Sequence, residues 1–248
     1  MKGKITFKIL FMFFVISFLG NCSFNMLTPE AKKMKKLALI TVYVTKQGIF
    51  KGNGADRKVR NQVAKYYEFF EDELGKVKGW KVVPVSAFSN TTAYKQFYKD
   101  ITNSTGYNIS KVHHFIAKDM VYLERGMFTA GGDQAKLKKL LQSMDVDGAI
   151  VVSLKLKFAK SGGFSIGNIG TSNKKVEAET DMMIVDRNAE YVGGGLRSFT
   201  SDTEIKSFKL GADFSDFEAM FTKNTAMFDE AVKNSAINYK NLINKELN

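Results

Sequence analysis

The feature that most constrains the fold is a pair of segments, 153–157 and 177–181, in which charged or polar residues alternate with other residues. Side chains on a β-strand point alternately to opposite faces, so each segment predicts a strand with one strongly polar face. One segment carries lysines and the other carboxylates, which favours an antiparallel hairpin. The predicted opposite pairs are Lys157 with Glu177, Lys155 with Glu179, Ser153 with Asp181, Leu156 with Ala178, Leu154 with Thr180, and Val152 with Met182.

This hairpin is predicted to belong to a three-stranded meander. The strands lie near 148–158, 175–186 and 190–200, and a Gly/Ser/Asn loop at 161–173 joins the first two. From about residue 215 to 247, apolar residues recur at near-helical spacing and predict one long helix that closes the domain. These residues are Phe217, Phe221, Phe228, Val232, Tyr239 and Leu242.

The N-terminal half is predicted to alternate strands and helices. Residues 37–44 form a short, β-branched apolar run, typical of a strand buried on both faces and parallel to a neighbour. A helix follows, with Asp56 as its cap and Gly79 after its end. Its apolar face comprises Val59, Val63, Tyr66, Phe70, Leu74 and Val77.

Three further elements complete the predicted architecture. A strand over 80–83 ends at Pro84, which cannot donate a sheet hydrogen bond and therefore indicates a sheet edge or a strand end. Helices are predicted within 90–103 and over 133–144. This order implies a single layered α/β domain with a mixed sheet, a C-terminal strand meander and a long closing helix.

Composition restricts the class of protein. The chain has 248 residues, of which 44% are hydrophobic and 25% charged, and this excludes a disordered, collagen-like or multi-span membrane protein. Its single cysteine excludes a disulfide framework. The net charge of +12 comes from 32 lysines and only five arginines, so few side chains offer bidentate phosphate recognition. We predict no nucleic-acid partner; anionic lipid, lipopolysaccharide or acidic polymers suit this charge better, with general solubility as the alternative.

The N-terminus has the features of an export signal. Three lysines, at 2, 4 and 8, precede a nearly unbroken apolar run from Ile9 to Leu19. These eleven residues would span roughly 16 Å as a helix, whereas a bilayer core requires about 20 residues. A cleaved signal peptide is therefore preferred to a permanent transmembrane anchor.

The only cysteine, Cys22, follows Leu19-Gly20-Asn21, and this segment resembles the lipobox of bacterial lipoproteins in its relaxed, spirochaete-style form. The resemblance implies cleavage before Cys22 and acylation of that residue, with palmitate among the acyl chains. Several chains are needed because one alone holds a protein only marginally to a bilayer. Ser23 after the cysteine implies sorting to the outer membrane. The alternative is an incidental thiol behind an ordinary signal peptide.

These features divide the chain into three predicted regions. Residues 1–21 form the lipoprotein signal peptide, residues 22–36 the lipidated cysteine and a tether, and residues 37–248 the α/β domain. The tether contains lysines at 32, 33, 35 and 36. Such a run either attracts an anionic bilayer, at roughly 1 kcal/mol per lysine, or acts as a solvated spacer.

A second resemblance concerns the domain. The segments SMDVDGAIVVSLKLKF and VEAETDMMIVDRNAEYVGGG resemble CsgG/TolB-N-terminal-like modules, through Asp147-Gly148-Ala149 and Ile184-Val185-Asp186. That family implies assembly and protein contact rather than catalysis. CsgG spans the outer membrane with long hairpins, and here only the predicted short loop at 161–173 could serve that purpose, which argues against a pore.

One motif suggests an enzyme. Gly163-Phe164-Ser165-Ile166-Gly167 satisfies the G-x-S-x-G pattern of a hydrolase nucleophile elbow. The elbow requires a helix after the serine and a histidine downstream. Here the segment leads into a predicted strand, and His113 and His114 both precede it. We therefore predict no catalytic residue.

No metal or cofactor site is predicted. His113 and His114 are adjacent, so they point to opposite faces of a strand or about 100° apart on a helix, which suits joint ligation poorly. The acidic row at 177–181 offers carboxylates for calcium or acid–base chemistry, but pairing with lysines explains it better.

The glycine-rich segments are interpreted as turns and bulges rather than as ligand sites, and an aromatic run is predicted on a helix. Glycines at 48, 52 and 54 lack the spacing of a phosphate loop and predict a turn, and Gly193 to Gly195 predict bulges. The run YYEFF has more apolar positions than one helical stripe needs, so Tyr67 or Phe69 contacts either the core or a partner.

Together these observations predict a non-enzymatic lipoprotein anchored through Cys22, whose periplasmic domain serves protein interaction or envelope assembly at the outer membrane. The alternative is a surface-exposed adhesin or ligand-binding lipoprotein that exploits its positive charge.

Overall fold

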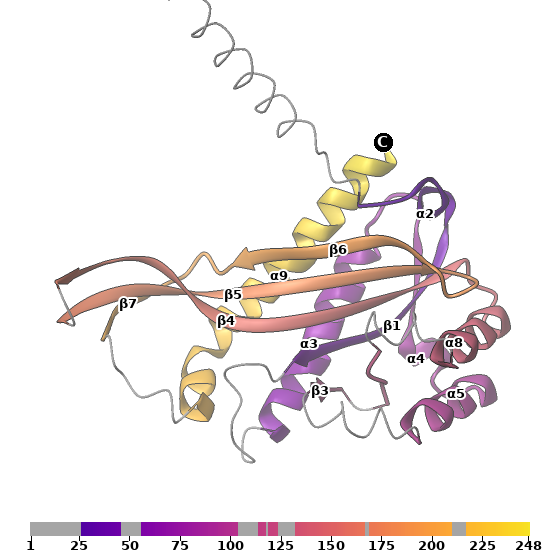
Figure 1. The fold of residues 1–248 in the computed structure, drawn as a ribbon, viewed down its shortest axis with the longest axis horizontal. Helices are drawn as coiled ribbons and strands as arrows, with labels where there is room; N and C mark the ends of the chain where they lie inside the picture. The colour runs from indigo at the N-terminus through magenta and orange to yellow at the C-terminus, as the bar shows by residue number, and fades with distance from the viewer. Residues whose placement is uncertain are drawn as a thin grey trace, which may run out of the picture.

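The structure is a computed structural model that describes residues 26–45, 56–103, 114–117, 119–123, 132–166, 169–209 and 217–248. Within these residues a seven-stranded mixed sheet has the order β2-β1-β4-β5-β6, with β3 paired to β1 and β7 to β5 (Figure 1). The strands are β1 (Lys36–Thr45), β2 (Lys81–Pro84), β3 (His114–Ile116), β4 (Gly148–Ile166), β5 (Ile169–Asp186), β6 (Tyr191–Thr200) and β7 (Ile205–Lys209). The helices are α2 (Pro29–Lys33), α3 (Asp56–Leu74), α4 (Val85–Phe88), α5 (Thr92–Thr102), α8 (Gly132–Ser143) and α9 (Phe217–Leu247).

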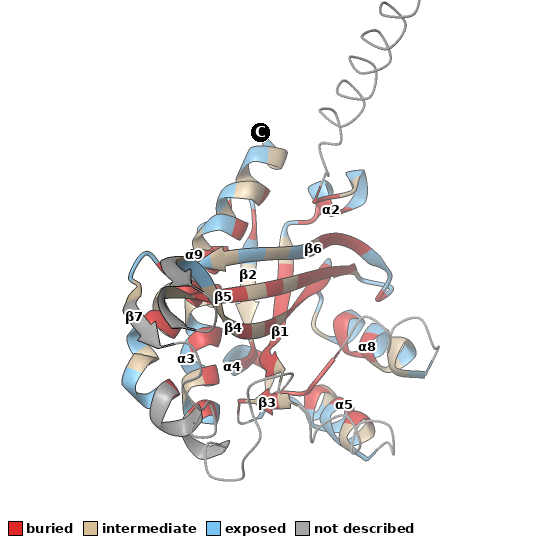
Figure 2. Ribbon diagram, turned by 60° about the vertical axis from the view of Figure 1, so that its left-hand side comes forward, coloured by how far each residue is buried: buried red, intermediate tan, exposed pale blue. Residues whose placement is uncertain are grey.

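Helices cover the sheet on both sides. Figure 2 shows α3 and α9 on one side of the strands, and α5 and α8 on the other. Every residue of β1 from Leu37 to Val44 is buried, as its apolar sequence predicts. This strand pairs in parallel with both β2 and β4. The predicted single α/β domain, with a mixed sheet, a strand meander and a long closing helix, is confirmed.

The predicted elements of the N-terminal half are also confirmed. All six apolar residues assigned to the face of α3 are buried, although the helix ends at Leu74 and Val77 lies in the turn that follows. β2 ends at Pro84 and lies at one end of the main strand order. Helices α5 and α8 occupy the two predicted helical segments.

The predicted hairpin register is correct. All six opposite pairs derived from the alternation of 153–157 and 177–181 are present between β4 and β5. β6 then pairs antiparallel with β5 and completes the meander. A register shift opposite Ile184 and Val185 gives the bulge predicted near Gly193 to Gly195.

The predicted loop at 161–173 is wrong. β4 continues to Ile166 and β5 begins at Ile169, so the two strands remain paired over this segment. A register shift between Lys160 and Gly162 accommodates one extra residue in β4, and β7, which was not predicted, pairs with β5. None of the described side chains from 159 to 162 and from 173 to 175 is buried, so the strands have no apolar period there for the sequence to reveal.

The tether predicted over 22–36 is wrong from Met26 onward. Met26 and Leu27 are each only 2% exposed, and both backbone amides donate to the carboxylate of Glu246, at 2.5 and 2.9 Å. The amide of Gly194 donates to the carbonyl of Met26 at 2.7 Å. A Cβ on Gly193 would lie 2.8 Å from that same carbonyl, so glycine allows the N-terminal segment to cross β6 closely. The packed fold therefore includes residues 26–36.

Helix α9 closes the domain as predicted, beginning at Phe217 and kinked at Asn224. Phe221, Phe228, Val232 and Tyr239 are buried against the sheet and α3, and Leu242 is partly buried. Among the described helices, none combines the length and the apolar character needed to cross a bilayer.

Candidate functional site

The β4–β5 hairpin passes through three environments along its length. Residues 149–152 and 182–185 are buried at every position, which indicates cover on both faces. Residues 153–157 and 176–181 alternate between buried and half-buried, which indicates cover on one face. Beyond these positions the two strands continue past the helices as a projecting ribbon (Figure 1). We define the ribbon as residues 159–166 and 169–175.

The covered face of the hairpin is fastened to α9 by aromatic and polar contacts. Phe158 meets Phe228 edge to face, with ring centroids 5.5 Å apart. Thr180 and Ser235 hydroxyls share a buried hydrogen bond of 2.8 Å. The hydroxyl of Tyr239 lies 2.7 Å from the carbonyl of Thr180 and 2.6 Å from that of Gly195, so it joins β5 to β6. These contacts fix the base from which the ribbon projects.

The uncovered face at the base carries the predicted ion pairs. Lys157 Nζ lies 3.1 Å from Glu177 and 2.9 Å from Glu179, and Lys155 Nζ lies 3.5 Å from Glu179. The hydrogen bond from Lys157 and the charge of Lys155 lower the pKa of Glu179 below its ordinary value. Side-chain pairing thus explains the acidic row, as cross-strand reasoning predicted.

Among the described residues, the ribbon presents an open strand edge on the β4 side. β1 pairs with β4 only as far as Leu154, and beyond that point β4 pairs only with β5 among the described residues. Such an edge carries backbone groups that can pair with a strand of another protein. The carboxylate of Glu204 bridges the two strands, because Ser161 Oγ donates to it at 2.9 Å and Asn173 Nδ2 at 3.2 Å. The bulge in β4 is therefore held in place from the segment that leads into β7.

Three lysines lie within the ribbon, at the end nearest to the helices. Lys160 of β4 lies directly opposite Lys174 of β5, and Lys175 is the next residue along. Like charges directly opposite each other destabilise a strand pair. None of the three lysines forms an ion pair within the described part of the chain. The arrangement suits a partner that brings carboxylates to the ribbon.

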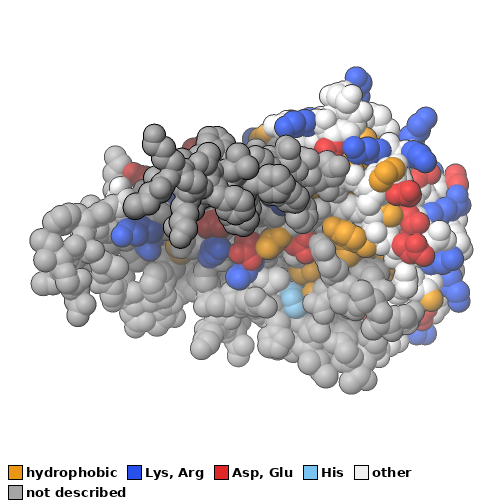
Figure 3. All heavy atoms as spheres, turned by 45° about the horizontal axis from the view of Figure 1, so that its top comes forward, with side chains coloured by type: hydrophobic (Ala, Val, Ile, Leu, Met, Phe, Trp, Pro, Cys, Tyr) orange, Lys and Arg blue, Asp and Glu red, His pale blue; other side chains and the backbone are white. Residues whose placement is uncertain are grey.

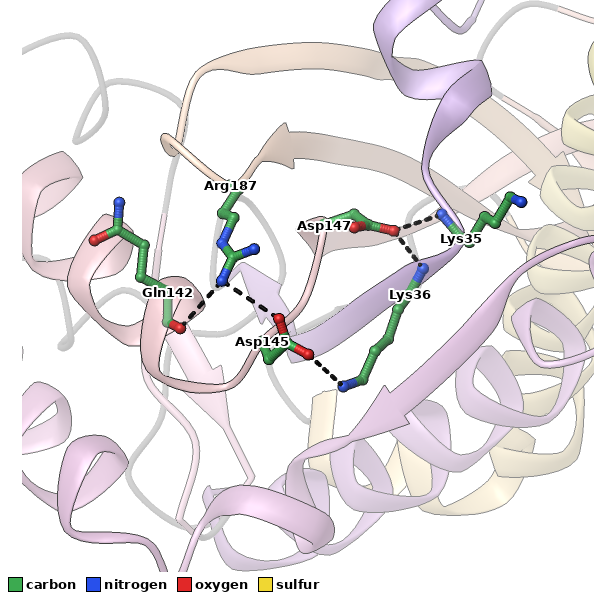
Figure 4. A network of polar contacts seen from close by, with 6 residues as sticks. All are labelled: Lys35, Lys36, Gln142, Asp145, Asp147 and Arg187. Carbon is green, nitrogen blue, oxygen red and sulfur yellow. Dashed lines mark hydrogen bonds and ion pairs between the residues drawn. The ribbon is translucent and has the colours of Figure 1, made fainter.

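Two aspartates, Asp147 and Asp186, stabilise strand ends. Asp147 Oδ2 accepts hydrogen bonds from the backbone amides of Lys35 and Lys36, at 2.8 and 2.9 Å (Figure 4). These bonds hold the start of β1 beside the start of β4. Asp186 Oδ1 accepts from the amides of Asn188 and Glu190 and closes the β5–β6 turn.

A mixed charge network surrounds Asp147. Asp145, which has a positive φ of 50°, lies 3.9 Å from Lys36 Nζ and 3.4 Å from an Arg187 nitrogen. In Figure 4 the side chain of Lys36 reaches Asp145, whereas that of Lys35 points away from both aspartates. Lys36 thus shares Asp145 with Arg187, whereas the side chain of Lys35 is exposed.

Several predicted positions lie outside the described residues. These are the signal peptide at 1–21, the lipidation candidate Cys22, His113, and the glycine-rich turn at 48–54. His114 begins β3, where its ring stacks on Tyr122 with centroids 4.0 Å apart and meets Tyr43 edge to face at 5.4 Å. Among the described residues, no group of three or more His, Cys, Asp or Glu side chains is arranged to hold a metal ion.

The G-x-S-x-G motif lies in the ribbon rather than in a nucleophile elbow. Ser165 belongs to β4 and its backbone is registered with Gly170 of β5. Strand therefore follows strand, whereas the elbow requires a helix immediately after the serine.

The aromatic run on α3 belongs to the core. Tyr67 is 4% exposed; its hydroxyl donates to the carbonyl of Leu39 at 2.9 Å and accepts from the amide of Val85 at 2.7 Å. Burial raises the pKa of this phenol well above its ordinary value. Phe69 is partly buried against the core, with Lys65 Nζ 5.6 Å from its ring centre. The interpretation of Tyr67 as a partner contact is therefore wrong.

A hollow beside α5 has no counterpart among the sequence predictions. It has a volume of about 220 Å³ and is lined by Ser89, Asn90, Tyr94, Lys95, Tyr98 and Asp119. Tyr94 donates to the carbonyl of Asp119 at 2.8 Å, so its hydroxyl already has a partner.

Comparisons with known proteins give no family. No protein-family model matches the chain, and no curated protein matches it. The hypothetical protein CT253 from Chlamydia trachomatis is 11% identical, with 85% of this chain and 98% of that chain covered and a TM-score of 0.35. Lipoprotein GNA1162 from Neisseria meningitidis is 12% identical, with 77% and 95% covered and a TM-score of 0.25. The LpoB C-terminal domain from Salmonella enterica is 12% identical, with 66% and 81% covered and a TM-score of 0.27. All three TM-scores are below 0.5, and these similarities assign neither a family nor a function to the chain.

Proposed function

We propose that this chain is a non-enzymatic lipoprotein, anchored to the outer membrane through Cys22, whose α/β domain binds a partner protein in the periplasm through the β4–β5 ribbon. The observation that carries the proposal is the ribbon itself, a paired strand extension whose β4 edge is open among the described residues. Its facing lysines favour a partner strand or loop that carries carboxylates.

The chemistry of the described residues supports an interaction role. Ser165 of the G-x-S-x-G motif lies within strand β4, and Glu177 and Glu179 are paired with lysines. A hairpin held firmly at one end and open along one edge suits strand addition, in which the backbone provides affinity and side chains provide specificity.

Charge reversal on the ribbon tests this function. We expect the double variant Lys160→Glu/Lys174→Glu to lower recovery of the partner at least about 10-fold after crosslinking in cells, because two attractive contacts become repulsive. The matched control is Lys95→Glu/Lys99→Glu, which reverses two exposed lysines of α5. Equal losses in both variants, or no loss in either, would contradict a ribbon-directed partner.

The anchor has its own test. Replacing Cys22 with Ser should release the protein from membranes, and mass analysis of the wild-type chain should find an acylated N-terminal cysteine at position 22. A mature polypeptide that retains residues 1–21, or a bare thiol at Cys22, contradicts the anchor. Protease treatment of intact cells tests the periplasmic placement, since loss of the domain without envelope rupture would instead place it on the cell surface.

A further inference from the structure

Three segments far apart in the sequence meet where the described chain begins. The amides of Met26 and Leu27 are bonded to Glu246 near the end of α9. The amide of Lys78, in the turn before β2, donates to the side-chain oxygen of Asn244 at 2.8 Å. The amide of Lys81 donates to the carbonyl of Lys35 at 2.6 Å. Residues 26–36, 76–81 and 240–248 thus form one connected region, which we call the anchor-side surface.

This surface holds most of the net positive charge of the processed chain. Its three segments contain nine lysines and two glutamates, a net charge of +7, whereas the chain without residues 1–21 has a net charge of +9. One of the two glutamates, Glu246, is engaged by backbone amides. Figure 3, which brings the top of Figure 1 toward the viewer, shows Lys and Arg side chains at the upper right and along the right margin of the view, with acidic groups among them.

Three of the nine lysines form ion pairs, and two carboxylates supply all the partners. Glu73 binds Lys76 at 2.5 Å and Lys240 at 2.9 Å, and Lys36 pairs with Asp145. Partial burial alone would raise the pKa of Glu73, but hydrogen bonds from Lys240 and Lys76 lower it below its ordinary value. The other six lysines are exposed and form no ion pair within the described residues. They are Lys32, Lys33, Lys35, Lys78, Lys81 and Lys245.

The length of chain before Met26 limits how far this surface can lie from an anchor at Cys22. Only residues 23–25 separate the two positions, and four residue steps span at most about 14 Å. Charges act over a screening length of about 8 Å at physiological ionic strength. A bilayer that held Cys22 would therefore lie within about two screening lengths of Met26, where the anchor-side surface begins.

We infer that the anchor-side surface docks onto anionic phospholipid headgroups, an inference that rests on the proposed acylation of Cys22. Docking fixes the orientation of the domain. β4 runs parallel to β1 and begins at this surface, so its end lies roughly 60 Å along the strand direction, at about 3.3 Å per residue. The far end of the ribbon is thereby directed away from the membrane, toward a partner.

Vesicle binding tests the surface without the acyl chains. The probe is the chain from residue 22 onward with Cys22→Ser, which retains every residue that the structure describes and therefore every contact among them. We expect it to sediment with phosphatidylcholine vesicles containing 30% phosphatidylglycerol and not with phosphatidylcholine alone. Raising the salt to 1 M, where the screening length falls to about 3 Å, should abolish binding.

A matched pair of triple variants locates the contact. Lys32→Gln/Lys33→Gln/Lys35→Gln should lower the partition coefficient about 5-fold for each lysine removed. Lys95→Gln/Lys99→Gln/Lys138→Gln removes three exposed lysines of α5 and α8 and should leave the partition coefficient unchanged. Equal binding to neutral and anionic vesicles, or equal losses in both triple variants, would overturn the inference.

The acylated protein gives a second measurement. In vesicles containing phosphatidylglycerol, amine acetylation should be slower at the six anchor-side lysines than at Lys95 and Lys99, and in neutral vesicles this difference should disappear. Uniform acetylation in both vesicles overturns docking even when Cys22 carries lipid. A bare Cys22 contradicts the proposed anchor. The vesicle binding of the Cys22→Ser chain does not depend on acylation, so it tests the anchor-side surface separately.

Discussion

The two halves of the β4–β5 hairpin belong to the same pair of strands but have different neighbours. The half formed by residues 148–158 and 176–186 lies beside β1 and β6 and packs its apolar residues beneath α9. The ribbon half pairs with β7 and is bracketed by Glu204, and none of its described side chains is buried. The comparison shows that the apolar pattern of a strand depends on how many of its faces are buried. A strand that has no buried face can therefore form without any apolar pattern in its sequence.

The largest expected difference between the halves concerns burial. Phe228→Ala removes a ring that is fully buried between Phe158 and Phe221, and we expect it to lower the free energy of unfolding by about 4 kcal/mol. Lys160→Ala in the ribbon should change it by less than about 0.5 kcal/mol. Urea unfolding followed by circular dichroism measures both. A comparable loss from the two substitutions would mean that the ribbon shares the core stability of the base.

Substitution of two neighbouring glycines by alanine should destabilise the fold to different degrees, because only one of them has a backbone group close by. Gly194 has φ +108°, and an added Cβ would lie 2.0 Å from the carbonyl oxygen of Met182 in the covered half of β5. Gly195 has φ +143°, and a Cβ added there would meet nothing within 4 Å among the described residues. We expect Gly194→Ala to cost about 3 kcal/mol and Gly195→Ala about 1–2 kcal/mol. If thermal or urea unfolding ranks them in the opposite order, the close contact of β5 with β6 is not what requires glycine.

Alkaline pH should destabilise the fold, and the covered half contributes to this loss through Tyr239. Burial raises the pKa of Tyr239, which joins β5 and β6 to α9, above its ordinary value. Above about pH 10 the unfolded chain ionises this phenol while the folded chain does not, so stability is present below pH 10 and is lost as the pH rises. Tyr239→Phe should reduce the slope of this loss by up to about 1.4 kcal/mol per pH unit. Unfolding curves from pH 9 to 11.5 measure it, and identical slopes would contradict a buried, protonated phenol.

The smallest expected effect concerns the hydrogen bonds from Ser161 and Asn173 to Glu204, which join the two strands of the ribbon. Glu204→Gln weakens the hydrogen bonds to Ser161 and Asn173, and because these groups are exposed or half-buried we expect less than about 1 kcal/mol of global destabilisation. Amide exchange should accelerate several-fold in the ribbon and remain unchanged at 148–158. Asp202→Asn, at an exposed neighbouring residue, is the control. Faster exchange throughout β4 would show that the two halves open together.

Much of the fold was predictable because its patterns are local. The alternation at 153–157 and 177–181 specified the hairpin register, since a shift of one residue would have put lysines beneath α9. The apolar run at 37–44 identified a strand covered on both faces. The ribbon and β7 were missed because Gly, Ser, Asn and Lys residues in an uncovered strand look like a loop. The packed segment at 26–36 was missed because its lysines obscure Met26, Leu27 and Ala31, whose burial depends on β6 and α9.

The candidate site was predicted less completely than the fold. Lysine–carboxylate pairing at 155–157 and 177–179 follows from sequence, and the structure confirms it. The open edge of β4 depends on where β1 stops, at Leu154, and no local pattern marks that position. The anchor-side surface unites residues from both ends of the chain, and only their meeting in the fold brings those charges together.

By itself, the sequence determined the four longest described helices, most of the strands, their faces and the hairpin register, because side-chain periodicity is a property of neighbouring residues. The tertiary structure decided how far the hairpin extends, where the packed chain begins, and which lysines share a surface. These outcomes depend on contacts between distant segments, whose energies are set by the neighbours that the fold supplies.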